Sequence, residues 1–197
     1  IKDVSIAGPG FINFTLKDDW LYETIELINK LKEDYGKTDT GQKEKVLIEF
    51  VSANPTGPLH VGHSRGAVVG DMTANIMEEA GFDVTREYYF NDAGNQIDIL
   101  AESTLIRYKQ LFDIDIELPK NAYHGEYLIG IAKQLKDEYG KSLLEKEQDE
   151  QIKICKEFSF KKLKTKIEDD LKYFGIKFNN WFYESTLHNG EIQKAID

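Results

Sequence analysis

Two histidines separated by two residues, His60 and His63, are the side chains in this sequence best suited to phosphate chemistry. They follow an apolar run, residues 46–51, and precede a segment with helical periodicity, so they occupy a strand-to-helix junction. A helix N-terminus presents main-chain N–H groups and a partial positive charge, which favour an anion. Imidazoles add hydrogen bonds or positive charge as charge builds on a phosphate, and Gly62 lets a ligand approach the main chain. This segment therefore predicts a nucleotide site in which phosphate is the reacting group.

A strand, a helix and a second strand are predicted around these histidines. The apolar run at residues 46–51 predicts a buried strand, residues 61–80 a helix that ends before Gly81, and residues 84–90 the second strand. The apolar stripe of the helix is expected to consist of Val69, Met72, Ile76 and Met77. This order predicts a right-handed βαβ unit and a parallel sheet. Ligands in such folds bind beyond the carboxyl ends of the strands, where residues 52–63 would lie.

Further elements are predicted on both sides of this unit. Residues 10–16 alternate as a strand does, and residues 21–31 have helical spacing, with Asp18 or Asp19 as the cap. Residues 36–45 are polar and contain glycines, which is typical of a linker. Three more helices are predicted after the second strand, at residues 95–112, 125–139 and 149–174.

The fold class expected from this pattern is α/β. We expect the first half of a Rossmann-like, parallel-sheet nucleotide-binding core with a largely helical insertion, preceded by the tail of a small N-terminal domain. The predicted parts are residues 1–40 (domain tail and connecting helix), residues 46–92 (first half of the core) and residues 93–197 (mainly helical insertion). Because the sequence begins at Ile1 and ends within a predicted helix, we expect it to be part of a longer protein.

Composition and charge narrow the class of protein. Of the 197 residues, 41% are apolar and 30% are charged, as in globular proteins. The formal net charge of −10 argues against a domain that binds nucleic acid by general electrostatics. No apolar stretch approaches the roughly 20 residues that span a bilayer, so we expect no membrane partner and a cytoplasmic location. A single cysteine, Cys155, excludes an internal disulfide and a cysteine-based zinc site.

The two histidines belong to a four-residue motif that is common by itself, but the residues around it form a longer and more specific pattern. His-x-Gly-His occurs by chance, and an isolated histidine is usually structural, but here two prolines stiffen the preceding loop. The longer pattern comprises Glu49, Ser52, Asn54, Pro55, Gly57, Pro58, His60, Gly62 and His63. Residues 49–70 resemble the signature of class I aminoacyl-tRNA synthetases, and specifically that of bacterial-type arginyl-tRNA synthetases. Further blocks resemble segments of that family, so that the resemblance covers nearly the whole chain; they are residues 88–96, 123–127 and 178–184.

The resemblance implies an arginine–tRNA ligase, which activates L-arginine with ATP to arginyl-adenylate and transfers it to tRNA(Arg). His60 and His63 would be catalytic, since they would stabilise the transition state as the carboxylate of arginine attacks the α-phosphate. His60, Gly62 and His63 would together bind ATP. The residues implied for arginine are Glu49, Ser52, Asn54 and His63, and those implied to support the site are Asp92 and Gln96. A carboxylate is the strongest side-chain partner for a guanidinium or an ammonium.

Some of these residues have competing structural interpretations. Glu49 could be a strand-end carboxylate that faces solvent, and Asn54 precedes a proline, where asparagine commonly starts a turn. Asp92 or Asn91 could cap the helix that begins near Asn95. The sequence leaves these alternatives open.

Other expectations concern partners and completeness. The second signature of the family, a Lys-Met-Ser-Lys-Ser-like loop, does not occur in these 197 residues, and nothing resembles the helical anticodon-binding domain. The chain alone is therefore expected to be inactive, with tRNA(Arg) bound mainly by parts outside it. ATP is expected as a substrate, accompanied by Mg²⁺, with no metal site in the protein, and the protein is expected to be monomeric.

Two other functions remain as alternatives. The first is another nucleotidyltransferase, because such enzymes also carry a His-x-Gly-His signature at a strand-to-helix junction. The second is a non-catalytic module, descended from a synthetase, that binds a partner or an amino acid.

Overall fold

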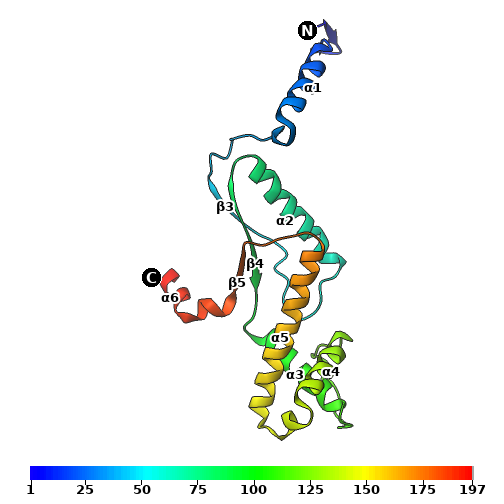
Figure 1. Ribbon diagram of the computed structural model, residues 1–197, viewed down its shortest axis with the longest axis vertical. Helices are drawn as coiled ribbons and strands as arrows, with labels where there is room; N and C mark the ends of the chain where they lie inside the picture. The colour runs from blue at the N-terminus through cyan, green and yellow to red at the C-terminus, as the bar shows by residue number, and fades with distance from the viewer. Residues whose placement is uncertain (197) are drawn as a thin grey trace.

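A three-stranded parallel sheet lies at the centre of the computed structural model, which describes residues 1–196 (Figure 1). The strands, in their order across the sheet, are β3 (Lys45–Glu49), β4 (Asp83–Phe90) and β5 (Asn180–Tyr183). Val46 is in register with Val84, and Tyr88 with Trp181. Because the strands are parallel, their carboxyl ends meet at one edge of the sheet. The predicted α/β class and parallel sheet are confirmed.

Helix α2 (Val61–Glu79) connects β3 to β4 and packs on the sheet through small residues. Its buried residues are Ala67, Gly70 and Ala74. A Cβ atom at Gly70 would collide with the ring of Phe50, so the missing side chain permits this close approach. The helix ends before Gly81, which has a φ of +91° as expected of a C′ glycine.

The predicted apolar stripe of α2 does not face the sheet. Val69, Met72 and Ile76 remain 60%, 50% and 64% exposed, respectively. Only small side chains fit between the helix and the rings of the sheet, so the larger ones are turned outward. The predicted helix is confirmed, and three of the four residues of its apolar stripe lie on its exposed side.

A charged cluster fastens α2 to β4. The guanidinium of Arg86 is almost fully buried, and it donates hydrogen bonds to Glu78 at 2.8 Å and to Asn75 at 2.7 Å. Asp71 lies 3.7 Å from the Arg86 Nε atom. The hydrogen bond to Arg86 holds the pKa of the Glu78 carboxyl below its usual range. The cluster thereby fixes the far end of the helix that begins at the two histidines.

Three helices form a layer beside the sheet. They are α3 (Asn95–Gln110), α4 (Tyr127–Tyr139) and α5 (Gln148–Tyr173), each close to its predicted bounds. The last part of α5 packs on the sheet through Ile167 and Leu171. One of their two apolar cores includes Leu100, Leu128 and Leu163, and the other includes Tyr108 and Cys155. After α5 the chain returns to the sheet as β5, a strand that was not predicted within the helical part.

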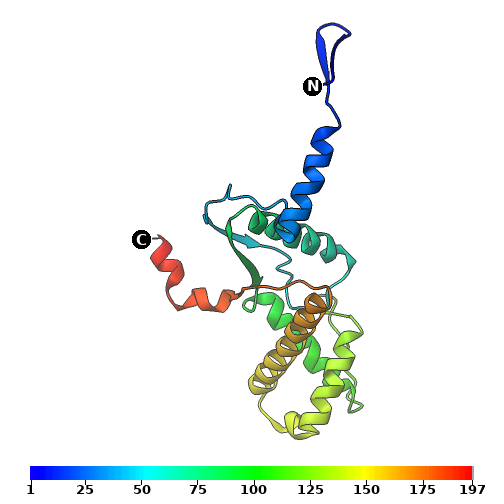
Figure 2. The same ribbon diagram turned by 45° about the horizontal axis from the view of Figure 1, so that its top comes forward.

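The N-terminal residues form an arm that projects from the rest of the molecule in both views (Figures 1 and 2). Strand β2 (Phe11–Thr15) confirms the predicted strand, but its antiparallel partner β1 (Asp3–Ala7) was not predicted. None of the residues of helix α1 (Asp19–Leu31) is buried. Asp18 takes the N-cap position, one of the two predicted for the cap, but its backbone angles are helical and its side chain makes no capping hydrogen bond.

The remaining elements are short. They are η1 (Lys32–Asp34), η2 (Ser142–Glu145), η3 (Glu184–Asn189) and α6 (Glu191–Ile196). Among the described residues, no helix combines the length and apolarity needed to cross a membrane.

Candidate functional site

The chain turns sharply where β3 ends, and this turn begins the segment that contains the histidines. Val51 and Ser52 both have positive φ angles, of 65° and 39°. Such angles are unfavourable for residues other than glycine, above all for a β-branched one, and cost on the order of 1–3 kcal/mol each. The Oγ atom of Ser52 accepts a hydrogen bond from the main-chain N–H of Tyr89 at 3.1 Å. Strain of this kind persists where the surroundings impose it, as they often do at functional sites.

Side chains from other elements hold the first part of the signature segment, by which we mean residues 52–63. The hydroxyl of Tyr88, on β4, donates to the carbonyl oxygen of Ala53 at 2.9 Å. The Nδ2 atom of Asn54 donates to Oε1 of Gln96, in the first turn of α3, at 2.7 Å. Pro55, which follows, is fully buried. The structure therefore brings together two of the residues predicted for the site, Asn54 and Gln96.

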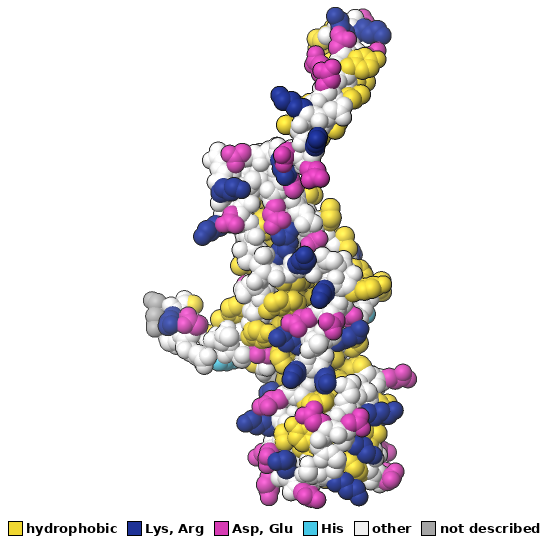
Figure 3. Space-filling view, viewed as in Figure 1, with side chains coloured by type: hydrophobic (Ala, Val, Ile, Leu, Met, Phe, Trp, Pro, Cys, Tyr) yellow, Lys and Arg dark blue, Asp and Glu magenta, His cyan; other side chains and the backbone are white. Residues whose placement is uncertain are grey.

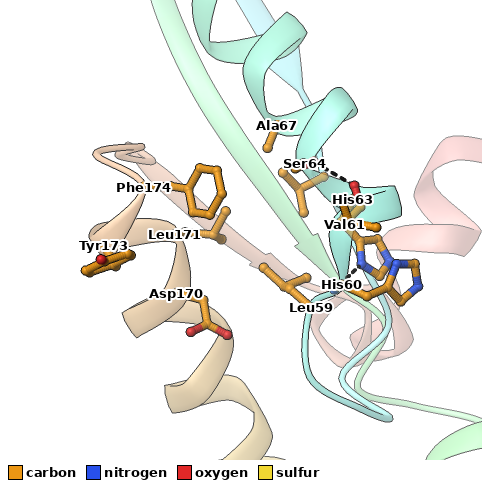
Figure 4. Close-up of a pocket in the computed structure, with 11 residues that line it drawn as sticks. Leu59, His60, Val61, His63, Ser64, Ala67, Asp170, Leu171, Tyr173 and Phe174 are labelled. Carbon is orange, nitrogen blue, oxygen red and sulfur yellow. Dashed lines mark hydrogen bonds between the residues drawn. The ribbon is translucent and has the colours of Figure 1, made fainter.

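The two histidines form the start of α2 and bond to its main chain. His60 is the N-cap residue, and its Nδ1 atom accepts a hydrogen bond from the N–H of Gly62 at 3.1 Å. His63 Nδ1 accepts from the N–H of His60, also at 3.1 Å, and the two rings lie 3.9 Å apart between centroids (Figure 4). Because both Nδ1 atoms are acceptors, a neutral ring carries its proton on Nε2. Each imidazole is thus fixed in the tautomer that can donate to an anion.

The environment of His63 favours its neutral form. Burial lowers the pKa of His63 below its usual value of 6.5, and repulsion from His60 lowers it further. A neutral imidazole with its proton on Nε2 still donates a hydrogen bond. The pair can therefore stabilise phosphate oxygens without both rings being charged.

A hollow of about 360 Å³ opens beside the histidines. On one side it is bordered by His60 and His63, and on the other by Asp170, Tyr173 and Phe174 at the end of α5 (Figure 4). Its surface is mainly apolar, and the space-filling view shows apolar side chains exposed across this part of the molecule (Figure 3). The described lining does not include the residues predicted for arginine other than His63. The hollow is therefore one surface beside the histidines, and its described lining is separate from Glu49, Ser52 and Asn54.

The second surface is an acidic one at the carboxyl edge of the sheet. Glu49 ends β3, Asp92 follows β4 and Glu184 follows β5. Burial raises the pKa of Tyr89, and the negative charges of these three carboxylates raise it further. Three carboxylates gathered at the ends of three parallel strands favour a cationic ligand.

Asp92 connects two loops at this edge and does not cap a helix. Its carboxylate accepts hydrogen bonds from the main-chain N–H and the hydroxyl of Ser185, at 2.8 and 2.7 Å. The N-cap residue of α3 is Gly94, and no side chain caps this helix. The capping interpretation is therefore wrong, since Asp92 is turned toward the residues that follow β5.

Sequence reasoning missed several residues that build the site. Glu184 belongs to the acidic edge, Ser185 binds Asp92, and Tyr127 reaches the signature segment from α4. Tyr127 and Glu184 stand in blocks that resemble the synthetase family, at residues 123–127 and 178–184, and that resemblance was the only available signal. Their roles depend on contacts between residues far apart in the sequence.

Among the described residues, no group of three or more histidine, cysteine, aspartate or glutamate side chains is arranged to hold a metal ion.

The fold and the site together point to one class of protein. The parallel sheet, and the histidines at the N-terminus of the helix that follows its first strand, agree with the class I signature that residues 49–70 resemble. A family model described as "tRNA synthetases class I (R), catalytic domain" matches residues 25–174. The chain belongs to this family, the arginyl branch of class I aminoacyl-tRNA synthetases.

Relatives with known names agree with this assignment. The chain is 49% identical to an arginine–tRNA ligase of Shouchella clausii and 47% identical to one of Bacillus cereus, in each case over 197 residues. These matches cover 100% of the chain but 35% of each relative, so the chain spans about a third of their length.

Solved structures resemble the chain over most of its length. A Campylobacter jejuni protein, provisionally described as an arginyl-tRNA synthetase, matches 89% of this chain and 38% of its own, with a TM-score of 0.79 and 34% identity. The arginyl-tRNA synthetase of Thermus thermophilus matches 99% of this chain and 32% of its own, with a TM-score of 0.52; at 21% identity it supports the fold alone. The resemblance seen in the sequence and the expected fold are therefore confirmed.

Proposed function

We propose that this chain supplies one half of the active site of an arginine–tRNA ligase. In the reaction, a carboxylate oxygen of L-arginine attacks the α-phosphorus of ATP, pyrophosphate leaves, and arginyl-adenylate forms. The terminal ribose hydroxyl of tRNA(Arg) then attacks the carbonyl carbon of arginine and displaces AMP. The observation that carries the proposal is the pair of imidazoles at the N-terminus of α2, both with Nδ1 bound to the main chain.

His60 and His63 take the phosphate side of the reaction. Their Nε2–H groups donate to oxygens of the ATP phosphates as negative charge builds there, and the missing side chain of Gly62 leaves room for the His60 ring, which an added Cβ atom would meet at 2.8 Å. The N-terminus of α2 adds its partial positive charge. Removing one such donor from an active site typically lowers the rate about 100- to 1,000-fold.

Glu49, Ser52 and Asn54 take the arginine side, together with His63. Ser52 uses its Oγ atom as an acceptor toward Tyr89, so its hydroxyl proton can still be donated to the substrate carboxylate. Asn54 uses Nδ2 toward Gln96, which leaves its Oδ1 atom to accept from the substrate ammonium. Glu49, with the rest of the acidic edge, supplies the negative charge that a cationic amino acid requires.

Asp92 and Gln96 support these contacts. Gln96 orients the amide of Asn54, and Asp92 joins the loops that follow β4 and β5. Both act by holding residues that face the ligand.

The other partners and parts complete this proposal. Mg²⁺ accompanies ATP and is bound by its phosphates, and tRNA(Arg) is bound mainly by parts outside these residues. Residues 1–40 form the tail of an N-terminal domain, residues 46–92 the first half of the catalytic core and residues 93–197 a mainly helical insertion, to which β5 adds a strand of the core sheet. The protein acts as a monomer in the cytoplasm.

The test is an exchange assay between pyrophosphate and ATP with the complete protein that contains this chain. We expect exchange that depends on arginine and on none of the other standard amino acids, and no exchange by residues 1–197 alone. Exchange that requires no amino acid would support another nucleotidyltransferase. Arginine binding without exchange would support the non-catalytic module, and robust exchange by residues 1–197 would refute the half-site.

A further inference from the structure

Tyr127, the first residue of α4, joins the helical layer to the signature segment. Its hydroxyl donates a hydrogen bond of 2.5 Å to the carbonyl oxygen of Thr56, across 71 residues of sequence. Its ring also lies against the next residue, Gly57, where an added Cβ atom would stand 3.7 Å from the phenol. The contact thus includes both a hydrogen bond and packing against the main chain.

The surroundings of Tyr127 are shaped to hold this ring. A Cβ atom at Gly125 would collide with the ring of Tyr127, so the missing side chain of Gly125 creates the space that the ring occupies. Burial raises the pKa of the Tyr127 phenol to about 12, which keeps it protonated, and therefore a donor, at neutral pH. The spacing of the Tyr-His-Gly-Glu-Tyr block, residues 123–127, thereby acquires a physical reason.

Thr56 occupies a distinct place within the signature segment. The anchors from Tyr88 and Gln96 hold Ala53 and Asn54, on the side proposed to bind arginine. Thr56 comes after the buried Pro55 and four residues before His60. Of the three anchors described, the one from Tyr127 therefore lies closest in sequence to the histidines.

We propose that Tyr127 is a positioning residue of the active site, which acts from the helical insertion on the phosphate-binding histidines through the main-chain carbonyl of Thr56. This inference rests on the proposed function of the histidines. A hydrogen bond to the main chain fixes the segment without touching the substrate, so its loss shifts His60 relative to ATP while the arginine contacts keep their own anchors. Small displacements of catalytic groups are costly because the reaction depends on their alignment.

The direct test is Tyr127→Phe in the complete protein, which removes the hydroxyl and keeps the ring. We expect kcat for arginine-dependent pyrophosphate exchange to fall about five- to tenfold, as for the loss of one hydrogen bond, while the KM for arginine changes less than about twofold. The matched control is Tyr139→Phe, at the other end of the same helix, where the ring packs on the second helical core and exchange should be unchanged.

A second variant tests the same contact by steric means. Gly125→Ala adds a methyl group at the point where the ring of Tyr127 lies, and it should displace the ring and reduce kcat to a similar degree. If Tyr127→Phe keeps the kcat of the wild type, the positioning role is refuted. Equal losses in kcat and arginine affinity would also refute it, because they would indicate a general disturbance of the fold.

A measurement without catalysis separates this inference from the proposed function. Hydrogen–deuterium exchange of the wild type and of Tyr127→Phe should show faster uptake in the variant at residues 52–63, with no change in Tyr139→Phe. Suppose that the variant takes up deuterium faster but the wild type shows no arginine-dependent pyrophosphate exchange. The hydrogen bond from Tyr127 would then be supported as an anchor of the segment, and the proposed function would be refuted. If the wild type is active but deuterium uptake at residues 52–63 is unchanged in Tyr127→Phe, only the anchoring role of Tyr127 would be refuted.

Discussion

The two halves of the signature segment are held in opposite ways. Its first half is bound by side chains of β4, α3 and α4, and Pro55 within it is fully buried. Its second half, at the start of α2, bonds within its own turn: His60 and His63 use their Nδ1 atoms for the main-chain N–H groups of Gly62 and His60.

This difference indicates that the two halves of the signature segment have different roles. The first half gains its position from the rest of the fold, so that changes there act through geometry. The second half keeps the Nε2 side of each imidazole for a ligand, so that changes there remove chemistry directly.

The largest effect is expected from His60→Asn. Asparagine is a favourable N-cap residue, so α2 should remain intact, but the Nε2 donor toward the phosphate is lost. We expect kcat for pyrophosphate exchange to fall about 100-fold or more, with a melting temperature close to that of the wild type. If His60→Asn keeps the kcat of the wild type, the second half of the signature segment does not take part in the reaction in the way proposed.

Glu49→Gln should produce the next largest effect, and on a different parameter. Removing the negative charge while keeping the shape weakens a charge-assisted hydrogen bond, so the KM for arginine should rise about tenfold or more. The control is Asp83→Asn, the same neutralisation at the amino end of β4, on the opposite edge of the sheet. An unchanged KM and kcat/KM for arginine in Glu49→Gln would remove this residue from the site.

Tyr88→Phe tests the first half of the segment. The variant loses the hydrogen bond to Ala53 and leaves that carbonyl without its buried partner. The free energy of local opening around residues 52–56, measured by hydrogen exchange, should fall by about 1 kcal/mol. Tyr35→Phe, an exposed tyrosine of the N-terminal part, is the control and should leave it unchanged. If the free energy of local opening is the same in Tyr88→Phe and Tyr35→Phe, the hydrogen bond from Tyr88 does not hold the first half of the segment in place.

The smallest effect concerns the protonation of His63. Its pKa lies below 6.5 in the folded protein, so the unfolded state binds more protons as the pH falls through this range. The contribution of His63 to stability is therefore present above pH 6.5 and is lost as the pH falls toward its folded pKa. An NMR titration of labelled histidines should place His63 below 6.5, and His60→Asn should move it upward by removing the repulsion. A titration at or above 6.5 in the wild type would contradict this account.

The sequence alone located the elements whose periodicity extends over many residues. The strand–helix–strand unit around the histidines and the three later helices lie close to their predicted bounds. Strand β5 was not predicted, because it has only four residues and because its partner β4 is separated from it in the sequence by all three helices. The apolar stripe of α2 lies mainly on its exposed side, because the helix packs on the sheet through Ala67, Gly70 and Ala74, and the ring of Phe50 leaves no room for a Cβ atom at Gly70.

The sequence predicted which types of residue form the candidate site, but not the hydrogen bonds that hold them in place. The histidines and Glu49 stand out by chemistry and by resemblance to a family. Ser52 looked like a ligand contact, and Asn54 like a ligand contact or a turn residue. The structure gives each a partner, Tyr89 and Gln96, that no local pattern reveals. Such partners depend on how distant segments pack, and this information is not contained in spacing along the chain.

The most direct test is a crystal structure of the complete protein with a non-hydrolysable analogue of arginyl-adenylate. We predict that oxygens of the group that replaces the phosphate lie within about 3.2 Å of the Nε2 atoms of His60 and His63. The charged groups of the arginyl part should lie at Glu49 and the acidic edge of the sheet. An analogue bound with its phosphate-like group away from the start of α2, or with its arginyl part in the apolar hollow between α2 and α5, would contradict the account.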